Sequence, residues 1–562
     1  MRRAGISEPS ALRRVLAPVA ALSCLILLLG ASPALATAFT VSFPASVERG
    51  SVTGRLLLVV APKDGPEPRL TISLNGPPIF GTDVEDLEAG EIVRVDATDG
   101  YPASALGDLP DGEYRVQAVL VRYTEVTRAD GHTIQVPLSH RRVFAPAMPG
   151  NLYSPPVLVR IDDDEAEVVH LSLERIIPPL PELEDTPWIR RVRIRSEILS
   201  RFWGVPMYLG ASVLLPRGFD EDPGARYPAI YVFGHGDTPF GFDPDPASHE
   251  GERARAADAN VETGHEFFQA WTADDFPRVA AITLEHPSPY FVESYAVNSA
   301  NNGPYGDAIT QELIPYLERE FRLIAAPHAR IVEGASTGGW EALALQLSYP
   351  QTFGGAWVFN PDPISFRRYQ LVDIYSDANM FTTPLPGGRE AERPFRRSRE
   401  GQPLLGVRDI AAFEAALGSR GRSGYQLDIW QATHGPVGPD GYPVPLFDKR
   451  SGRIDPEVAA YMRAQGYDLT ARLRDNWAEL SPQIAGKLNL FAGDMDDFYL
   501  NLGVYDFEDM VRELGGPDFP IRFEYGRPKK GHNWHHTNWA GVVREMARHI
   551  ESSTPRDQEP AQ

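Results

Sequence analysis

A serine flanked by glycines is the residue of this chain best placed to carry out covalent chemistry. The stretch Gly334-Ala335-Ser336-Thr337-Gly338 follows an apolar run at 330–333 and opens a helical pattern at 337–349. Glycines on both sides permit a tight strand-to-helix turn in which larger side chains would clash. Such a turn holds the hydroxyl clear of the backbone, near helix amides that favour developing negative charge. One interpretation of Ser336 is therefore a nucleophile, and the other is a plain helix N-cap.

A serine nucleophile needs a neighbouring base, and the base needs an orienting acid. An apolar run at 488–491 leads into a carboxylate-rich turn. A second strand pattern, at 521–525, leads into Gly531 and the candidate base His532. Both groups follow predicted strands, and the carboxyl ends of parallel strands meet at one edge of a sheet. The candidates for the acid are Asp494, Asp496 and Asp497.

Two metal sites are alternative interpretations of the same residues. Asp494-x-Asp496-x-Phe498 is similar to the start of a calcium loop, but a phenylalanine side chain cannot ligate at the fifth position. The histidines near 532 form a cluster, but they lack His-Glu-x-x-His spacing and have no cysteine partner. We therefore predict no metal and no cofactor. The remaining members of the cluster are His535 and His536, and two histidines elsewhere, His235 and His434, are interpreted as structural.

The elements that must position these residues alternate along the C-terminal two-thirds of the chain. Buried strand patterns separated by helical patterns are typical of a mostly parallel sheet with helices on both faces. The helix predicted at 307–321 contains Pro315, which should kink it, and a helix at 539–550 closes the pattern. The predicted strands are 191–198, 208–215, 227–233, 279–284, 330–333, 356–359, 488–491 and 521–525.

Residues 361–485 interrupt this alternation as a large insertion. The insertion leaves the predicted sheet just after the strand at 356–359, at the edge that also carries Ser336. A segment rooted there is well placed to cover a site and to set substrate choice, although a plain surface subdomain is the alternative. Candidate apolar walls are Trp430, Tyr442 and Phe447, and candidate partners for an acidic substrate group are Arg396, Arg397 and Arg399.

The N-terminal part of the chain has a different pattern. Short β-type runs separated by Gly, Pro, Asn and Asp turns fill residues 37–150 and predict an antiparallel, sandwich-like domain that packs or binds rather than catalyses. Residues 151–190 are predicted to be a linker because prolines at positions 178, 179, 181 and 187 interrupt them. The domain with alternating strands and helices then extends over 191–552, and residues 553–562 are predicted to be a disordered tail.

The first 36 residues have the composition of an export signal. Arginines at positions 2, 3, 13 and 14 precede an apolar run from Val15 to Leu29. Ala34-Leu35-Ala36 then forms a small-x-small cleavage pattern. The apolar run is shorter than the roughly 20 residues of a membrane span, and a retained anchor is the alternative. We expect a periplasmic or extracellular protein with no stable membrane contact after cleavage.

Charge and cysteine content exclude several classes of function. The formal net charge is −22, and it becomes more negative once the arginine-rich signal is removed. Such a charge argues against nucleic acid and anionic membrane surfaces as partners. The only cysteine is Cys24, within the signal segment. Disulfides, thiolate catalysis and cysteine metal sites are therefore excluded from the rest of the chain.

With these motifs in place, the chain resembles the "putative esterase" family of α/β-hydrolases. This family includes esterase D (S-formylglutathione hydrolase), enterochelin esterases, feruloyl esterases and mycolyltransferases. The resemblance covers residues 200–360 and 486–550. It rests on PRGFDEDPGARYPAIYVFGHG (216–236), ELIPYLEREF (312–321), EGASTGGWEALALQLSYPQTF (333–353), GDMDDFYL (493–500) and GHNW (531–534).

The resemblance implies an α/β-hydrolase fold and a catalytic triad of Ser336, His532 and Asp496. The esterase D pattern Gly-x-x-Asp-x-Phe matches residues 493–498, and it is this match that selects Asp496 from the three aspartates. The family often has methionine where this chain has Thr337, but only the backbone amide is needed there. The implied oxyanion hole consists of the backbone amides of Thr337 and of Gly236 or Asp237.

These expectations describe an exported serine esterase that hydrolyses a carboxylic ester through an acyl-enzyme. The substrate is expected to be a small-molecule or carbohydrate-linked ester. Export argues against the formylglutathione role, and the size of the insertion leaves the ester undetermined. Two alternatives stay open, a serine peptidase and a non-catalytic binding protein built on a hydrolase scaffold.

Overall fold

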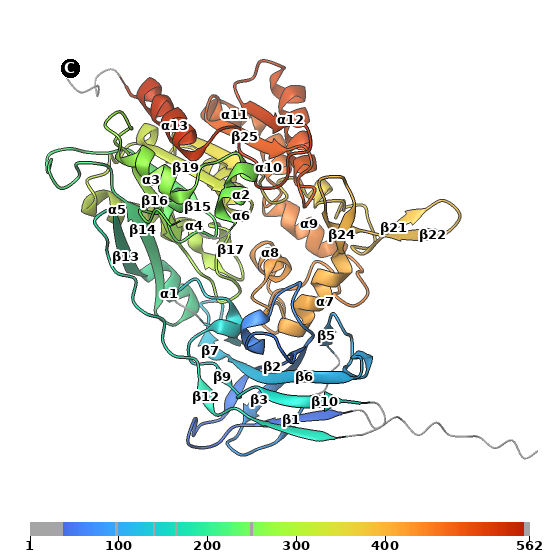
Figure 1. Ribbon diagram of the computed structural model, residues 1–562. Helices are drawn as coiled ribbons and strands as arrows, with labels where there is room; N and C mark the ends of the chain where they lie inside the picture. The colour runs from blue at the N-terminus through green and yellow to red at the C-terminus, as the bar shows by residue number, and fades with distance from the viewer. Residues whose placement is uncertain (1–36, 96–98, 139–140, 163–166, 248–250, 556–562) are drawn as a thin grey trace, which may run out of the picture.

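The computed structural model describes residues 37–95, 99–138, 141–162, 167–247 and 251–555. The predicted signal segment, residues 1–36, and most of the predicted tail lie outside the described residues. Figure 1 shows a group of N-terminal strands beside a larger mixed body that contains Ser336. Within the described ranges, no helix combines the length and the apolar character needed to cross a membrane.

An eight-stranded sheet organises the larger body. β14 is antiparallel to both of its neighbours, and all other adjacent strands are parallel. The mostly parallel sheet agrees with the predicted α/β class. In spatial order the strands are β13 (Ile189–Ser196), β14 (Met207–Leu214), β16 (Ala280–Glu285), β15 (Ala229–Phe233), β19 (Arg330–Ala335), β20 (Gly355–Phe359), β25 (Leu488–Gly493) and β26 (Arg522–Gly526).

Both faces of this sheet are buried. Successive side chains of a strand point to opposite faces, so that Ile331 and Val332 of β19 belong to two different apolar clusters. Strands covered on both faces are continuously apolar, which is why the sequence shows them as unbroken runs. Helices α3 (Gly264–Thr272) and α13 (Trp539–Ser553) pack on one face. Helices α1 (Glu197–Trp203), α6 (Thr337–Ser348) and α12 (Asn501–Gly515) pack on the other.

The single helix predicted over 307–321 is divided in the structure. It consists of α4 (Tyr305–Ala308), a π-helical turn at Ile309–Leu313 and α5 (Ile314–Glu320). Pro315 lies at the start of α5, where its missing N–H costs least. The proline therefore coincides with a break in the regular helix, as its position predicts.

Two of the described sheets form the core of the N-terminal β unit, which we define as residues 37–176, and β7 and β8 form a separate hairpin. One has the order β11-β1-β4, and the other has the order β12-β9-β6-β2-β3-β5 with β10 paired to β6. Side chains of both sheets share one apolar core, which includes Phe39 of β1 and Leu56 of β2. The strands are β1 (Ala38–Ser42), β2 (Val52–Pro62), β3 (Ile79–Leu87), β4 (Val93–Arg94), β5 (Asp99–Tyr101), β6 (Gly112–Arg122), β7 (Thr124–Thr127), β8 (Thr133–Val136), β9 (Leu152–Tyr153), β10 (Val157–Ile161), β11 (Val168–Ser172) and β12 (Arg175–Ile176).

The segment predicted as a linker, residues 151–190, differs from that expectation. Strands β9 to β12 come from it and pair with the N-terminal sheets, and β11 lies parallel to β1 although an antiparallel arrangement was predicted. Prolines at 178–187 mark only the second half of the segment. The prediction gave those prolines more weight than the alternating apolar residues of 157–161 and 168–172, whose side chains complete the N-terminal core.

Between β20 and β25 the chain builds helices and two small hairpins. The hairpins are β21–β22 and β23–β24, within residues 382–406. Helix α7 (Val407–Leu417) lies between this region and the N-terminal β unit (Figure 1). Its residues Phe413, Ala416 and Leu417 share an apolar cluster with strands of the N-terminal unit. The remaining helices are α8 (Gln426–His434), α9 (Pro456–Ala464), α10 (Leu469–Asp475) and α11 (Trp477–Ile484).

Candidate active site

Ser336 occupies a strained turn between β19 and α6. Its backbone has φ 58° and ψ −123°, a combination that residues with side chains rarely adopt. The turn is held by its own backbone, since the Ser336 N–H donates to the Phe359 carbonyl at 3.0 Å and its carbonyl accepts from Asp362 N–H at 3.0 Å. The strand-to-helix turn expected from Gly-x-Ser-x-Gly is therefore present, and the N-cap alternative finds no side-chain cap bond here.

Glycines surround Ser336 because the backbone leaves no space for larger residues. A Cβ at position 334 would lie 2.3 Å from the carbonyl carbon of Gly338. A Cβ at position 338 would lie 2.2 Å from the carbonyl oxygen of Phe233, at the end of β15. Real Cβ atoms do not approach backbone so closely, and the partners are not flexible side-chain ends. Close approach of β19, α6 and β15 thus requires glycine at both positions.

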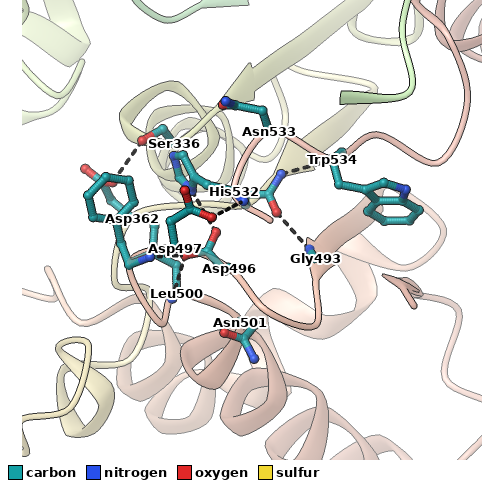
Figure 2. Close-up of polar contacts among 12 residues, drawn as sticks. Ser336, Asp362, Gly493, Asp496, Asp497, Leu500, Asn501, His532, Asn533 and Trp534 are labelled. Carbon is teal, nitrogen blue, oxygen red and sulfur yellow. Dashed lines mark hydrogen bonds and ion pairs between the residues drawn. The ribbon is translucent and has the colours of Figure 1, made fainter. Parts of the chain in front are cut away.

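Asp496 and His532 meet at the carboxyl ends of β25 and β26. His532 Nδ1 lies 2.7 Å from Asp496 Oδ2, as Figure 2 shows. The other carboxylate oxygen of Asp496 accepts from the backbone N–H groups of Phe498 at 2.9 Å and Leu500 at 3.1 Å. Asp496 is fully buried. A buried carboxylate with all of its oxygens satisfied is suited to hold an imidazole in one tautomer and orientation.

The two neighbouring aspartates contact the backbone instead of the imidazole ring. Asp494 Oδ1 accepts from Lys530 N–H at 2.9 Å. Asp497 Oδ1 accepts from the backbone N–H of His532 at 3.3 Å, and its Oδ2 lies 3.5 Å from Arg396. Of the three candidates, only Asp496 contacts the ring.

A fourth carboxylate, which the sequence analysis missed, lies beside the serine. Asp362 Oδ1 accepts from Ser336 Oγ at 3.3 Å (Figure 2). Its Oδ2 accepts from Tyr295 at 2.7 Å, Gln426 at 2.9 Å and Thr337 at 3.0 Å. Asp362 follows β20, the strand next to β19, and a carboxylate at that strand end was the available signal. The expected order of serine, acid and histidine placed the acid after the insertion, whereas Asp362 lies at the start of the insertion.

Burial and neighbouring charges set the protonation of these groups. Burial lowers the pKa of His532, but the neighbouring carboxylates, Asp496 first and then Asp362 and Asp497, raise it, so the net pKa lies above 6.5. Burial raises the pKa of Asp362, and the hydrogen bond from Tyr295 only partly offsets this. The histidine therefore holds a proton readily, as a group that accepts one from a nucleophile must.

The loop predicted to supply oxyanion amides is held by two arginines. Arg142 of the N-terminal β unit donates to the Gly236 carbonyl at 2.7 Å. Arg191 of β13 donates to the Asp237 carbonyl at 2.9 Å. These bonds fix the peptide planes of the loop after β15. Thr337 is the first residue of α6, where an amide has no partner within the helix, and its hydroxyl is bonded to Asp362.

Two cavities meet at Ser336. One, of about 570 Å³, is lined by Ser336, His532 and the Gly234–Gly236 loop. The other, of about 470 Å³, is lined by Ser336, Asp362, aromatic side chains of 361–485 and three residues of the N-terminal β unit. A molecule bound at Ser336 would thus have space on both sides of the serine.

The other histidines divide between structural positions and the site. His434 and His535 are buried, and burial lowers the pKa of each to about 3, so both are neutral. His536 pairs with Glu545 at 3.0 Å. His235 differs from its structural interpretation, because it lines both cavities and its pKa is raised by the buried Glu293 carboxylate 3.1 Å away. No group of three or more His, Cys, Asp or Glu residues in the described parts of the chain is arranged to hold a metal ion.

The residues proposed as apolar walls and as partners for an acidic substrate group also divide between the site and positions elsewhere. Trp430 lines the 470 Å³ cavity, whereas Tyr442 and Phe447 are buried in the apolar core. Arg396 lines that cavity next to Asp497. Arg397 donates to the Asp496 carbonyl at 2.9 Å, and Arg399 pairs with Asp258. Only Arg396 of the three arginines lines the cavity.

Comparison with known proteins gives one family and a set of solved structures. Residues 207–393 match the family described as putative esterase, which confirms the resemblance found in the sequence. The matched part includes Ser336 but ends before Asp496 and His532. No curated protein sequence matches the chain.

The similar solved structures are esterases and related hydrolases. A ferulic acid esterase is 16% identical over 64% of this chain and 98% of its own, with a TM-score of 0.34. An S-formylglutathione hydrolase from Staphylococcus aureus is 14% identical over 65% of this chain and 97% of its own, with a TM-score of 0.31. A ferulic acid esterase from Anaeromyces mucronatus is 12% identical over 66% and 93%, with a TM-score of 0.27.

Proposed function

We propose that the protein is an exported serine esterase that hydrolyses a carboxylic ester through a Ser336–His532–Asp496 triad. The observation that supports this most directly is the 2.7 Å contact of His532 with Asp496 in a cavity that Ser336 also lines. The match of residues 207–393 to an esterase family supports the reaction class. The ester itself is proposed to be a small-molecule or carbohydrate-linked ester.

The geometry supports a two-step mechanism. Ser336 Oγ attacks the ester carbonyl while His532 Nε2 takes its proton, and Asp496 holds the resulting imidazolium through Nδ1. The amides of Thr337 and of the Gly236–Asp237 loop stabilise the oxyanion. His532 then returns the proton to the leaving alcohol, and water releases the acid from the acyl-enzyme. In the free protein the Ser336 hydroxyl donates to Asp362, so it must rotate toward His532 before attack.

The finer domain arrangement belongs to the same proposal. A sandwich-like N-terminal domain is supported by two sheets that share one core. A covering role for residues 361–485 is supported by their aromatic side chains in the 470 Å³ cavity. Export rests on the sequence of residues 1–36 alone.

Replacement of Ser336 by alanine tests the function. Ser336→Ala should lower ester turnover by roughly 10⁴-fold or more and abolish labelling by a fluorophosphonate, with an unchanged melting temperature. Retained turnover in a folded variant would remove Ser336 from the mechanism. Aryl esters compared with peptide amides distinguish the peptidase alternative, and wild-type protein that no fluorophosphonate labels would favour the non-catalytic alternative.

A further inference from the structure

Three residues of the N-terminal β unit line a cavity at the serine. Ser73, Leu74 and Asn75 share the 470 Å³ cavity with Ser336, although more than 250 positions separate them in the chain. The rest of the lining comes from residues 361–485 and nearby loops, and it includes the aromatic side chains of Tyr369, Phe395 and Trp430. The described residues of the mixed body alone therefore do not enclose this space.

The turn that carries these residues is held in one conformation. Gly76 N–H donates to the Ser73 carbonyl at 2.9 Å, and the Tyr101 hydroxyl donates to the Leu74 carbonyl at 3.1 Å. A Cβ at position 76 would lie 2.3 Å from the Thr71 carbonyl oxygen, so the turn is closed tightly on itself. Leu74 packs against the apolar clusters of both the N-terminal unit and the mixed body. Asn75, in contrast, is exposed, and no hydrogen bond is recorded for its side chain among the described residues.

The N-terminal unit is also fixed against the elements that line the cavity. Arg55 of β2 is 2% exposed and donates to the carbonyls of Ala415 at 2.6 Å and Ala416 at 3.2 Å. These carbonyls lie at the C-terminal end of α7, so they have no partner within the helix, and the helix dipole favours a cation there. Asp83 and Asp99 balance the arginine charge at 3.2 and 3.3 Å. At a separate point, Arg142 holds the Gly236 carbonyl of the oxyanion loop.

We propose that the Ser73–Asn75 turn is a wall of the substrate cavity and limits the size of the ester group held there. The N-terminal β unit is then part of the active site and not an independent binding module. The substrate class it admits is an ester with one bulky, largely apolar group, which packs against the aromatic lining with its far end at Asn75. This inference rests on the proposed function, because it takes Ser336 as the reacting residue.

A larger side chain at position 75 tests whether the Ser73–Asn75 turn is a wall of the substrate cavity. We compare the rates at which Ser336 is labelled by an ethyl fluorophosphonate and by one that carries a biphenylalkyl chain. Asn75→Trp should slow labelling by the bulky probe by at least about fivefold, because the indole ring would occupy space in the cavity that the biphenyl group needs. It should change labelling by the ethyl probe less than about twofold, since that probe needs only the space at the serine. The bulky probe should label the Asn75→Ala variant at least as fast as it labels the wild type.

Ser46→Trp is the matched control. Ser46 is exposed in a turn of the same unit and lines neither cavity, so its replacement should alter neither rate. If Asn75→Trp leaves the ratio of the two labelling rates unchanged, the bulky group lies elsewhere and the inference is wrong. If neither probe labels the wild-type protein, or both label Ser336→Ala equally, the proposed function fails and the inference fails with it. Melting temperatures of all variants verify that they are folded.

Discussion

At the scale of single residues, the contacts of three neighbouring aspartates separate their roles. Asp496 alone touches the His532 ring, whereas Asp494 and Asp497 bond backbone amides. Asp496→Asn should lower kcat by roughly 10³-fold or more, because an amide no longer stabilises the imidazolium or the required tautomer. Asp494→Asn and Asp497→Asn should each cost less than about tenfold. The three variants are compared with one aryl ester, and a larger loss for Asp497→Asn would move the acid by one position.

The raised pKa of His532 predicts the pH dependence of turnover. The base must be neutral to accept the serine proton, so activity should fall as the pH drops through a pKa that lies above 6.5. Burial lowers this pKa, and the carboxylates that raise it are Asp496 first and then Asp362 and Asp497. Profiles of kcat/KM should therefore show the acidic limb of Asp496→Asn at lower pH than that of the wild type. A limb that stays in place or moves to higher pH would contradict the assignment of Asp496 as the charge that His532 senses.

The sequence predicted the strand-to-helix turn at Ser336 and selected Asp496 as the partner of His532, and the structure has that turn and that contact. It did not single out Asp362, although a carboxylate after a predicted strand was a signal for it, and it interpreted His235 as structural. Asp362 becomes part of the site only because β20 lies beside β19 and places its strand end next to Ser336. His235 gains a charge partner, Glu293, only through the folding of two separate loops. The spacing of residues along the chain predicts neither of these two contacts.

At the scale of secondary-structure elements, the close packing of β15, β19 and α6 predicts that a side chain at position 338 destabilises the fold. Gly338→Ala would place a Cβ 2.2 Å from the Phe233 carbonyl oxygen, so strand and helix would have to separate. We expect a loss of roughly 2–4 kcal/mol in the free energy of unfolding, together with reduced turnover.

The control for this prediction is Gly107→Ala. A Cβ at position 107 would meet no atom within 4 Å, so thermal melting of this variant should match the wild type. An undisturbed melting temperature for Gly338→Ala would mean that the turn relaxes without cost, and the explanation of the glycine motif would be wrong.

The sequence predicted the strands of the central sheet well because burial on both faces makes them continuously apolar. The N-terminal strands were harder to assign. β9 to β12 are short, and prolines adjoin them, so a linker was predicted where pairing partners far along the chain create strands. Pairing between β1 and β11 joins residues about 130 positions apart, which no local pattern encodes.

At the scale of the whole molecule, one buried arginine joins the N-terminal β unit to α7. Arg55→Ala would leave the α7 carbonyls uncapped and Asp83 without its cation, whereas Asp99 would keep its ion pair with Arg450 at 3.0 Å. We expect a loss of roughly 2–4 kcal/mol in the free energy of unfolding, since Asp83 and Asp99 are partly solvated and lose less than fully buried groups would. Thermal melting and limited proteolysis measure the effect.

Arg160→Ala serves as the control for the same measurements. Arg160 is 73% exposed on β10 and pairs only loosely with Asp162 at 3.4 Å, so its loss should change the free energy of unfolding by less than about 1 kcal/mol. Equal effects of the two substitutions would show that the contact between Arg55 and α7 does not stabilise the folded chain.

The cavity shared by Asn75 and Ser336 has a consequence for how the protein is made. A ribosome or an export channel releases the chain from its N-terminus, so the turn at 73–75 emerges first and His532 among the last residues. Until His532 has emerged, the serine lacks its proposed base, although the turn at 73–75 is already available. Ser336 should thus be unreactive in a nascent or partly translocated chain. The time at which hydrolytic activity appears would then report when folding is complete. Long-range contacts of this kind form slowly, which gives such a chain a lag between synthesis and function.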